Sequence, residues 1–243
     1  MQNTNEFFDN YSKNHGTFDF DKLKARPLYE IIPYEDELEF HRIATTLSLK
    51  GNLLKKYQLM DDLARRLDLT LLARGTSRSV YLVNYDSTIV VKIGYDKATI
   101  TDSAREFENQ QFIKPFCTKC FEISPTGTIG LFERVTPIIH FEKFESVAHD
   151  IFDILHKRVL GKYIMADIGM YNYMNYGLRE GFGAVLLDYP YLYEPDKSKL
   201  KCRNIIGSAS QICGGIIGYD NDFEHLLCNR CGKKYSVRDL AKD

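Results

Sequence analysis

The stretch that decides the fold is Asp167-Ile168-Gly169-Met170-Tyr171-Asn172, which sets an aspartate and an asparagine in one short polar segment. A long amphipathic pattern precedes this segment, and an apolar run at 184–187 follows it. The apolar run predicts a buried strand, and Asp188 comes directly after it. The chain thus places Asp167, Asn172 and Asp188 in a polar loop and at the end of a strand.

Upstream, the pattern switches several times between period two and the helical period. Two helices are predicted after Pro33 and over about 53–67, behind an irregular first 30 residues. The further predicted elements are a β-hairpin over 79–83 and 88–93, a helix from Ser103 to about 113 with Ser103 and Glu106 in capping-box spacing, strands near 121–123 and 128–132, and an amphipathic helix over 142–159.

Two features of the upstream half suggest binding of an anion. Gly75, Thr76 and Ser77 form a small-residue turn, and such turns let backbone N–H groups approach phosphate oxygens. Lys92 lies inside the apolar strand, where it either faces outward or points at an anion. Pro137 ends a further strand, close after Glu133.

In their order along the chain, these landmarks resemble the protein-kinase-like superfamily over residues of about 70 to 193. They are closer to aminoglycoside phosphotransferases and atypical phage or bacterial kinases than to eukaryotic kinases. The resemblance implies that Lys92 contacts the α- and β-phosphates of ATP and pairs with a helical glutamate, for which Glu106 and Glu108 are the candidates. Glu106 is weakly preferred, and the two residues cannot both face Lys92, because they are two positions apart on a helix. The segment 75–77 would cover the phosphates.

The same resemblance assigns the downstream residues. Asp167 would be the catalytic residue that orients the acceptor hydroxyl, with Lys92 as its catalytic partner. Asn172 and Asp188 would hold Mg²⁺, which needs few protein ligands when nucleotide phosphates complete its shell. The backbone near Glu133 would hold the adenine edge.

The chain also departs from the family pattern. Ala73 and Arg78 replace two glycines of the phosphate-covering loop, and Met165-Ala166 stands where the family has His-Arg. Tyr189-Pro190 replaces Phe-Gly after the metal-binding aspartate.

The C-terminal part is rich in cysteine, and a kinase would need further helices there. Cys228 and Cys231 have the spacing of a metal knuckle, and with Gly232 they resemble the second knuckle of a zinc ribbon. Cys202 and Cys213 would complete a four-thiolate Zn²⁺ site, although ten residues separate them. The alternative partners are Cys117 and Cys120, and His225 is a further possible ligand.

Composition limits the classes of function. The chain has 243 residues, 44% of them hydrophobic, which suits a large domain with a small appendage. A net charge of −1 argues against a general polyanion binder, although the C-terminal module has a basic-aromatic cluster suited to a protein or nucleic acid. No signal peptide or membrane span is expected, so the predicted location is cytoplasmic, or the host cytoplasm for a phage protein.

The predicted fold is therefore α+β: a two-lobed kinase-like fold with a truncated C-lobe, N-terminal helices and a small zinc ribbon. The predicted division is 1–68 for the arm and helices, 69–195 for the kinase-like domain (lobes of about 69–133 and 134–195), and 196–243 for the zinc module. The predicted function is a Mg-dependent phosphotransferase whose acceptor, a protein or a small molecule, is undefined. Transfer of AMP in place of phosphate is equally open. The alternative is an inactive pseudokinase scaffold.

Overall fold

The computed structural model describes residues 18–46, 49–96, 100–155, 159, 162–206 and 211–242, with only the backbone for residues 49–52, 146, 149, 150, 153 and 154. The first 17 residues of the predicted irregular arm lie outside this description. The chain forms two compact units, one from Phe18 to Val135 and one that begins at Thr136. Both combine helices with antiparallel strands, which confirms the predicted α+β class in its general form.

The first unit is built on a five-stranded antiparallel sheet with the order β1-β2-β3-β5-β4. Its strands are β1 (Leu69–Arg74), β2 (Arg78–Val83), β3 (Asp86–Gly94), β4 (Cys120–Ile123) and β5 (Ile129–Glu133). Its helices are η2 (Phe20–Lys22), α2 (Leu28–Ile31), α3 (Tyr34–Thr46), α4 (Leu49–Arg66) and α5 (Asp102–Ile113). The sheet order makes β3 the central strand.

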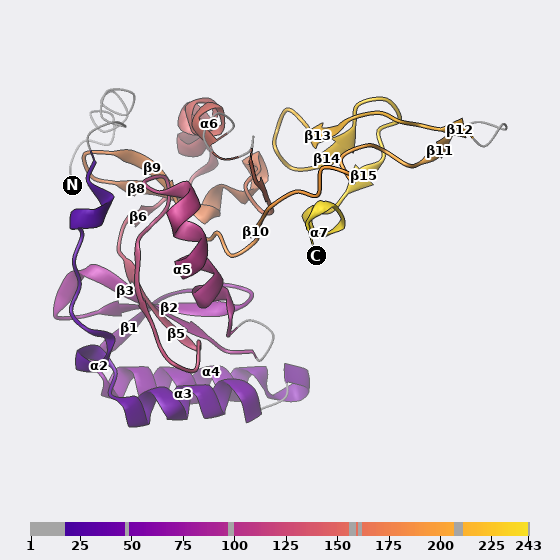
Figure 1. The fold of residues 1–243 in the computed structure, drawn as a ribbon. Coiled ribbons are helices and arrows are strands. Elements are labelled where there is room, and N and C mark those ends of the chain that lie inside the picture. The colour runs from indigo at the N-terminus through magenta and orange to yellow at the C-terminus, as the bar shows by residue number, and fades with distance from the viewer. Residues whose placement is uncertain are drawn as a thin grey trace. The chain divides into compact units, whose positions relative to one another are not determined.

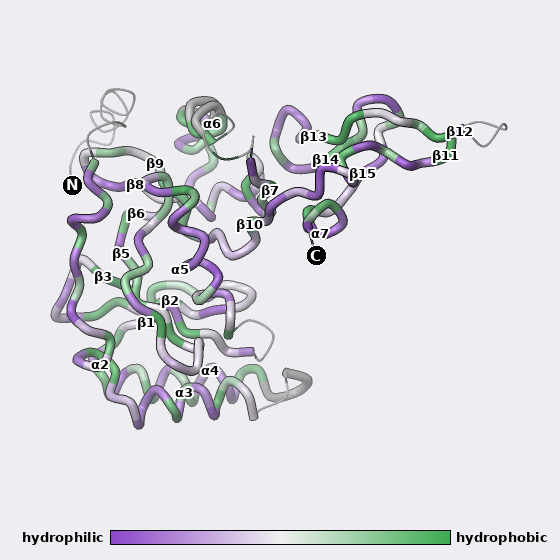
Figure 2. Tube along the Cα trace, in the orientation of Figure 1, coloured by the Kyte–Doolittle hydropathy of each residue, from purple (hydrophilic) through white to green (hydrophobic). Residues whose placement is uncertain are grey.

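Alternation along β3 sends its side chains to two different environments. Ile89, Val91 and Ile93 share a core with residues of α3 and α4, whereas Val90 belongs to a separate cluster with Cys120 and Phe132. Successive residues of a strand point to opposite faces, so Lys92 lies on the face of Val90. Figure 1 shows α3 and α4 on one side of the sheet and α5 on the other. Figure 2 shows hydrophobic and hydrophilic residues alternating along α3 and α4, as expected for helices with one buried side.

The second unit begins with β6 (Thr136–Pro137) and α6 (Phe141–Leu155). These are followed by β7 (Ile164–Met165), η4 (Met170–Asn175), β8 (Tyr176–Arg179), β9 (Gly183–Leu186) and β10 (Leu192–Tyr193). The strands form a three-stranded sheet with the order β6-β8-β9 and a separate β7–β10 pair. Phe144 of α6 packs on Tyr176 of β8, with ring centroids 4.8 Å apart, so α6 and this sheet share a core.

The rest of the second unit consists of short strands. These are β11 (Ile205–Ile206), β12 (Gln211–Ile212), β13 (Ile217–Tyr219), β14 (Leu226–Cys228) and β15 (Lys234–Tyr235), followed by α7 (Val237–Leu240). β13, β14 and β15 form one antiparallel sheet, and β11 and β12 form a hairpin (Figure 1). The core of this part of the unit has seven buried residues, including Ile164 of β7, and three of the seven are cysteines. None of the helices in the described residues has the length and apolar character required to cross a membrane.

Candidate functional site

A buried ion cluster occupies the face of the first sheet that α5 covers. Lys92 Nζ lies 3.1 Å and 3.2 Å from the two carboxylate oxygens of Glu106. Arg78 donates to the same carboxylate, with Nη1 at 2.5 Å from Oε2 and Nη2 at 3.2 Å from Oε1. All three side chains are buried. One carboxylate therefore meets two cations, and the carboxylate of Asp102, which is also buried, interacts electrostatically with Arg78.

The apolar surroundings fix the position of the lysine. Lys92 Nζ lies 4.1 Å from the centroid of the Phe132 ring, within cation–π range. Phe132 lies on β5, the neighbouring strand, where residue Gly130 pairs with Lys92. A Cβ at Gly130 would lie 2.9 Å from Ser103 Cβ, so a glycine here lets α5 approach the sheet closely. The close approach of α5 brings its glutamate within reach of Lys92.

Of the two candidate glutamates, Glu106 contacts Lys92 and Glu108 is exposed. The predicted capping box between Ser103 and Glu106 is wrong. The helix begins after Thr101 without a side-chain cap, and the Ser103 hydroxyl accepts a hydrogen bond of 3.2 Å from Arg78 instead. Burial beside two cations outweighs the local capping geometry, because a charge-assisted hydrogen bond is stronger than a neutral one.

The small-residue turn at 75–77 closes the β1–β2 hairpin. The Gly75 N–H donates to the Arg78 carbonyl at 2.8 Å, and the Gly75 carbonyl accepts from the Tyr95 hydroxyl at 2.5 Å. Thr76 is exposed, and the Ser77 hydroxyl bonds the carboxylate of Asp102. The internal bonds of Gly75 hold the turn in shape, and Gly75 and Thr76 are both exposed.

Glu133 ends β5, and its side chain is buried. Its carboxylate accepts a hydrogen bond of 3.0 Å from the Lys119 N–H, and its own N–H donates to the Lys119 carbonyl at 2.8 Å. Its side chain therefore ties β5 to the segment before β4.

The loop that contains Asp167 has an unusual backbone. Asp167 has a φ of 59°, in the left-handed region that few residues other than glycine and Asn or Asp adopt. Its carbonyl accepts a hydrogen bond of 2.9 Å from Asn175 Nδ2, and its side chain is exposed. Backbone strain of this kind is concentrated at functional sites.

Asn175 also brings the loop to the end of β9. Its carbonyl accepts a hydrogen bond of 2.7 Å from the Leu187 N–H, next to Asp188. In the β8–β9 hairpin Tyr176 pairs with Leu186, so Asp188 lies at the same end of the hairpin as the loop. Hydrogen bonds of Asn175 therefore connect the segment that contains Asp167 with the segment that contains Asp188.

The segment between β13 and β14 contacts this loop, and the sequence predicted none of these contacts. Glu224 Oε1 accepts a hydrogen bond of 2.6 Å from the Tyr171 N–H, and Glu224 Oε2 lies 3.4 Å from Asn172 Nδ2. A Cβ at Gly169 would overlap Glu224 Oε1, so a larger residue there would displace the Glu224 carboxylate from this position. The Met170 N–H donates to the Asp222 carbonyl at 3.0 Å. The acidic run around Asp222 was the one sequence signal available, and acidic residues are common in exposed loops.

Two aromatic residues extend this contact. The Tyr219 hydroxyl lies 2.7 Å from both the N–H and the carbonyl of Met165, so it accepts one hydrogen bond and donates the other. The Phe223 ring stacks on that of Phe152 of α6, with centroids 4.5 Å apart and planes 21° apart. Segments on both sides of Asp167 are thus attached to the C-terminal module.

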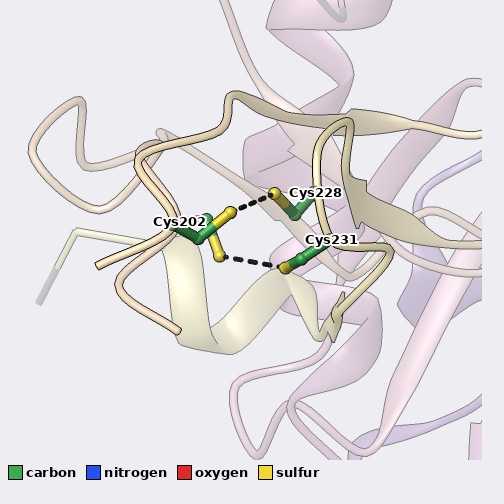
Figure 3. A group of neighbouring side chains, drawn as sticks. Cys202, Cys228 and Cys231 are labelled. Atoms are coloured by element: carbon green, nitrogen blue, oxygen red, sulfur yellow. Dashed lines mark hydrogen bonds between the residues drawn. The ribbon is translucent and has the colours of Figure 1, made fainter. Parts of the chain in front are cut away.

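The four predicted zinc ligands lie together: the sulfur atoms of Cys202, Cys213, Cys228 and Cys231 are all within 4.8 Å of one another. Figure 3 labels three of them, Cys202, Cys228 and Cys231. The Cys202–Cys231 and Cys213–Cys228 sulfur pairs are 3.6 Å and 3.5 Å apart, whereas a disulfide would need about 2.05 Å. Four sulfurs bonded to one Zn²⁺ at about 2.3 Å would lie about 3.8 Å apart. The donor set and its spacing therefore fit zinc.

The β11–β12 hairpin accounts for the wide separation of the first two ligands in the sequence. The Cys213 N–H donates to the Asn204 carbonyl at 2.8 Å, and the Cys202 carbonyl accepts from the Gly214 N–H at 2.9 Å. Antiparallel pairing at the base of the hairpin thus returns Cys213 to Cys202. A Cβ at Gly215 would lie 2.5 Å from Cys228 Sγ, so a glycine is needed where the two halves of the site meet.

Polar groups around Cys202 and Cys228 favour the thiolate, whereas the pKa of Cys213, although lowered by a backbone N–H, is raised to about 12 overall by burial and the neighbouring thiols. The Tyr235 hydroxyl donates to Cys202 Sγ at 3.0 Å, and the Arg230 N–H donates to Cys228 Sγ at 3.4 Å. Burial raises the pKa of Cys228, but the N–H groups of Cys231 and Arg230 and the neighbouring thiols lower it to about 6 overall. Thiolate is the form that binds zinc.

The alternative ligands lie elsewhere. Cys117 and Cys120 belong to the first unit and are not members of the four-sulfur group. Burial raises the pKa of Cys120 well above its usual value, which favours the neutral thiol. His225 Nδ1 lies 3.1 Å from the Asp220 carboxylate, and His225 is not a member of the group either.

Comparisons with known proteins yield little. No family model matches the chain, and none of the curated proteins does. Among solved structures, the chain is similar to the ternary complex of streptomycin, ATP and APH(2")-IIa, an aminoglycoside phosphotransferase with a kinase-like fold. The identity is 17% and the TM-score 0.26, over 41% of this chain and 33% of that chain. The chain thus spans about a third of that structure. This likeness is too weak to assign a role to any residue, so roles rest on the geometry of this chain.

Proposed function

We propose that the protein is a kinase-like ATP-binding protein that catalyses Mg²⁺-dependent phosphoryl transfer. The observation that carries the proposal is the buried Lys92–Glu106 pair between the central strand of a five-stranded sheet and the helix that covers it. Kinases use a strand lysine held by a helical glutamate to position nucleotide phosphates. We assign residues 69–195 to the kinase-like domain, with lobes of about 69–133 and 134–195.

The ion cluster suits an anionic ligand. Glu106 holds two cationic side chains, Arg78 and Lys92, on the face of the sheet that α5 covers. In this proposal Lys92 contacts the α- and β-phosphates, and the turn at 75–77 lies over them. Arg78 replaces a loop glycine and adds a second cation to the pair.

The proposal also gives roles to three residues of the second unit. Asp167 would orient the acceptor hydroxyl and accept its proton. Asn172 and Asp188 would hold Mg²⁺, and their oxygen atoms match the preference of that ion. Among the described residues no group of three acidic or His and Cys ligands other than the four cysteines lies close together, so nucleotide phosphates would complete the coordination. When bound, Mg²⁺ would neutralise charge that develops on the phosphates.

Zinc would have a structural role. The four cysteines leave no open coordination position, and the core of the module is too small to be stable alone. We assign residues 196–243 to this module.

The test is calorimetric titration with ATP in the presence and absence of Mg²⁺. We expect wild type to bind Mg·ATP, and we expect Asp188→Ala to lose the Mg²⁺-dependent part of the affinity. Glu180→Ala is the matched control, because Glu180 is an exposed acid at the turn of the hairpin that Asp188 follows. No binding by wild type at millimolar ATP would refute the proposal.

A second candidate function is a scaffold that binds nucleic acid through the zinc module. A hollow of about 380 Å³ in this module is lined by five basic side chains and one acidic one, namely Lys199, Lys201, Arg203, Lys233, Lys234 and Asp239. Asp239 is already bonded to the N–H of Ser236 in the capping box of α7. A positive hollow of this kind suits a phosphate backbone.

This second function has its own test. We expect a fluorescent single-stranded oligonucleotide to bind, with an affinity that falls as salt rises. The double variant Lys233→Gln, Lys234→Gln should weaken that affinity and reduce the salt dependence. Salt-independent binding, or no binding, would argue against this candidate.

A further inference from the structure

We infer that Glu224 of the zinc module is a positioning residue for Asn172, and that zinc occupancy thereby controls the geometry of the loop around Asp167. The inference rests on the proposed function, because Asn172 is there a ligand of Mg²⁺. The contacts on which it depends all lie within the second unit.

The first step concerns the orientation of the Asn172 amide. An ionised carboxylate accepts hydrogen bonds and donates none. Glu224 Oε2 at 3.4 Å therefore selects the amide orientation in which Nδ2 faces Glu224. The carbonyl oxygen of Asn172 then points away from Glu224, and in this proposal it is the atom that would contact Mg²⁺. Carboxylates behind metal ligands commonly orient them in this way, and their removal costs about 10–100-fold in metal affinity.

The second step concerns how Glu224 is itself held. Its N–H donates to Asp220 Oδ1 at 2.8 Å, and its other carboxylate oxygen accepts from the Tyr171 N–H at 2.6 Å. The neighbouring Phe223 has a φ of 58°, a conformation unusual for an aromatic residue. Its stacking on Phe152 compensates for this strain, and the turn delivers Glu224 to the loop.

The third step connects this contact to the zinc site. Glu224 lies four residues before Cys228, and β14 spans most of that distance. Ile217 pairs with Cys228, and Tyr219 pairs with Leu226. The β13–β14 hairpin therefore has a zinc ligand at one end and the contact with the Asp167 loop at the other. If the zinc site unfolds, this hairpin loses the residues that order it, and the loop loses Tyr219 and Glu224.

The main test compares wild type with Glu224→Gln in the full-length chain. Glutamine keeps the size of the side chain and an acceptor for the Tyr171 N–H, but it can also donate to the Asn172 carbonyl and turn the amide. We expect zinc content to be unchanged and the Mg²⁺ concentration for half-maximal ATP binding to rise about 10–100-fold. Binding of ATP without Mg²⁺ should stay the same. Glu180→Gln, an exposed change in the same unit, is the control and should match wild type.

A second measurement does not depend on nucleotide. Hydrogen exchange reports protection of the Met170 and Tyr171 amides, which donate to Asp222 and Glu224. We expect Glu224→Gln to lower protection at Tyr171, because the acceptor loses its charge. Removal of zinc from wild type with a chelator should abolish protection at both amides.

ATP binding and hydrogen exchange together distinguish a failure of the proposed function from a failure of the inference about Glu224. If wild type binds no Mg·ATP while Tyr171 protection falls in the variant and on zinc removal, the proposed function fails but the zinc-dependent contact stands. If wild type binds Mg·ATP and both Mg²⁺ dependence and amide protection are unaltered in Glu224→Gln, the inference is overturned. Protection that survives zinc removal would also overturn it.

Discussion

Substitution of Glu106 by glutamine tests the buried ion cluster most directly. The Glu106 carboxylate is fully buried and accepts from Lys92 and from both terminal nitrogens of Arg78. Glutamine removes the negative charge and leaves two cations buried close together. Removal of one partner from a buried ion pair costs about 3–5 kcal/mol. Because one carboxylate serves two cations here, we expect the free energy of unfolding to fall by an amount at the upper end of this range, about 5 kcal/mol.

The assay is urea unfolding followed by circular dichroism, with wild type and variant compared at pH 7. The control is Glu108→Gln, an exposed change on the same helix, for which we expect a change within about 0.5 kcal/mol. A double variant, Arg78→Met with Glu106→Gln, removes one of the two cations and should recover part of the loss. A loss below about 1 kcal/mol for Glu106→Gln would show that the cluster is solvated, and the reasoning would be refuted.

Three further predictions concern the zinc module and the start of α5. Gly215→Ala should weaken zinc binding about tenfold or more in chelator competition, because the added Cβ would lie 2.5 Å from Cys228 Sγ. The control is Gly218→Ala, whose Cβ would meet nothing within 4 Å and which should bind zinc as wild type does. Chelation of zinc should remove hydrogen-exchange protection from β13 to β15 while the β1–β5 sheet stays protected, because the small core of the module includes three of the ligands; protection that persists in β13 to β15 would contradict a structural zinc. Burial raises the pKa of Asp102, and one of its oxygens has no hydrogen-bond partner among the described residues. The folded state then binds more protons than the unfolded state just above pH 3.8, so stability falls as pH rises through that window. Asp102→Asn should lack this slope in urea unfolding measured as a function of pH, and an unchanged slope would assign it to another group.

Local patterns in the sequence determined which side chains share one face of an element. Alternation in β3 placed Lys92 opposite Val91 and Ile93, because strand side chains alternate whatever the rest of the chain does. The Cys228-x2-Cys231 spacing likewise predicts a metal knuckle locally, because its two sulfurs come from one tight turn. These conclusions need only the geometry of a few neighbouring residues.

Only the tertiary structure decided which side chains of similar type meet. Helical periodicity left Glu106 and Glu108 open, and the close packing of α5 on Gly130 selected the first. In the sequence, Arg78 stands where the kinase-like pattern has a glycine of the phosphate-covering loop. In the structure, Arg78 and Lys92 both contact the Glu106 carboxylate.

The tertiary structure alone also decided two contacts that involve the C-terminal module. Ten residues separate Cys202 from Cys213, and the β11–β12 hairpin brings them together. Glu224 is one of several acids in the sequence, and the turn at Phe223 brings it to Tyr171. Such pairings depend on contacts between segments distant in the chain, which no local period encodes. Their energies come from burial and charge, and these exist only once the segments are packed.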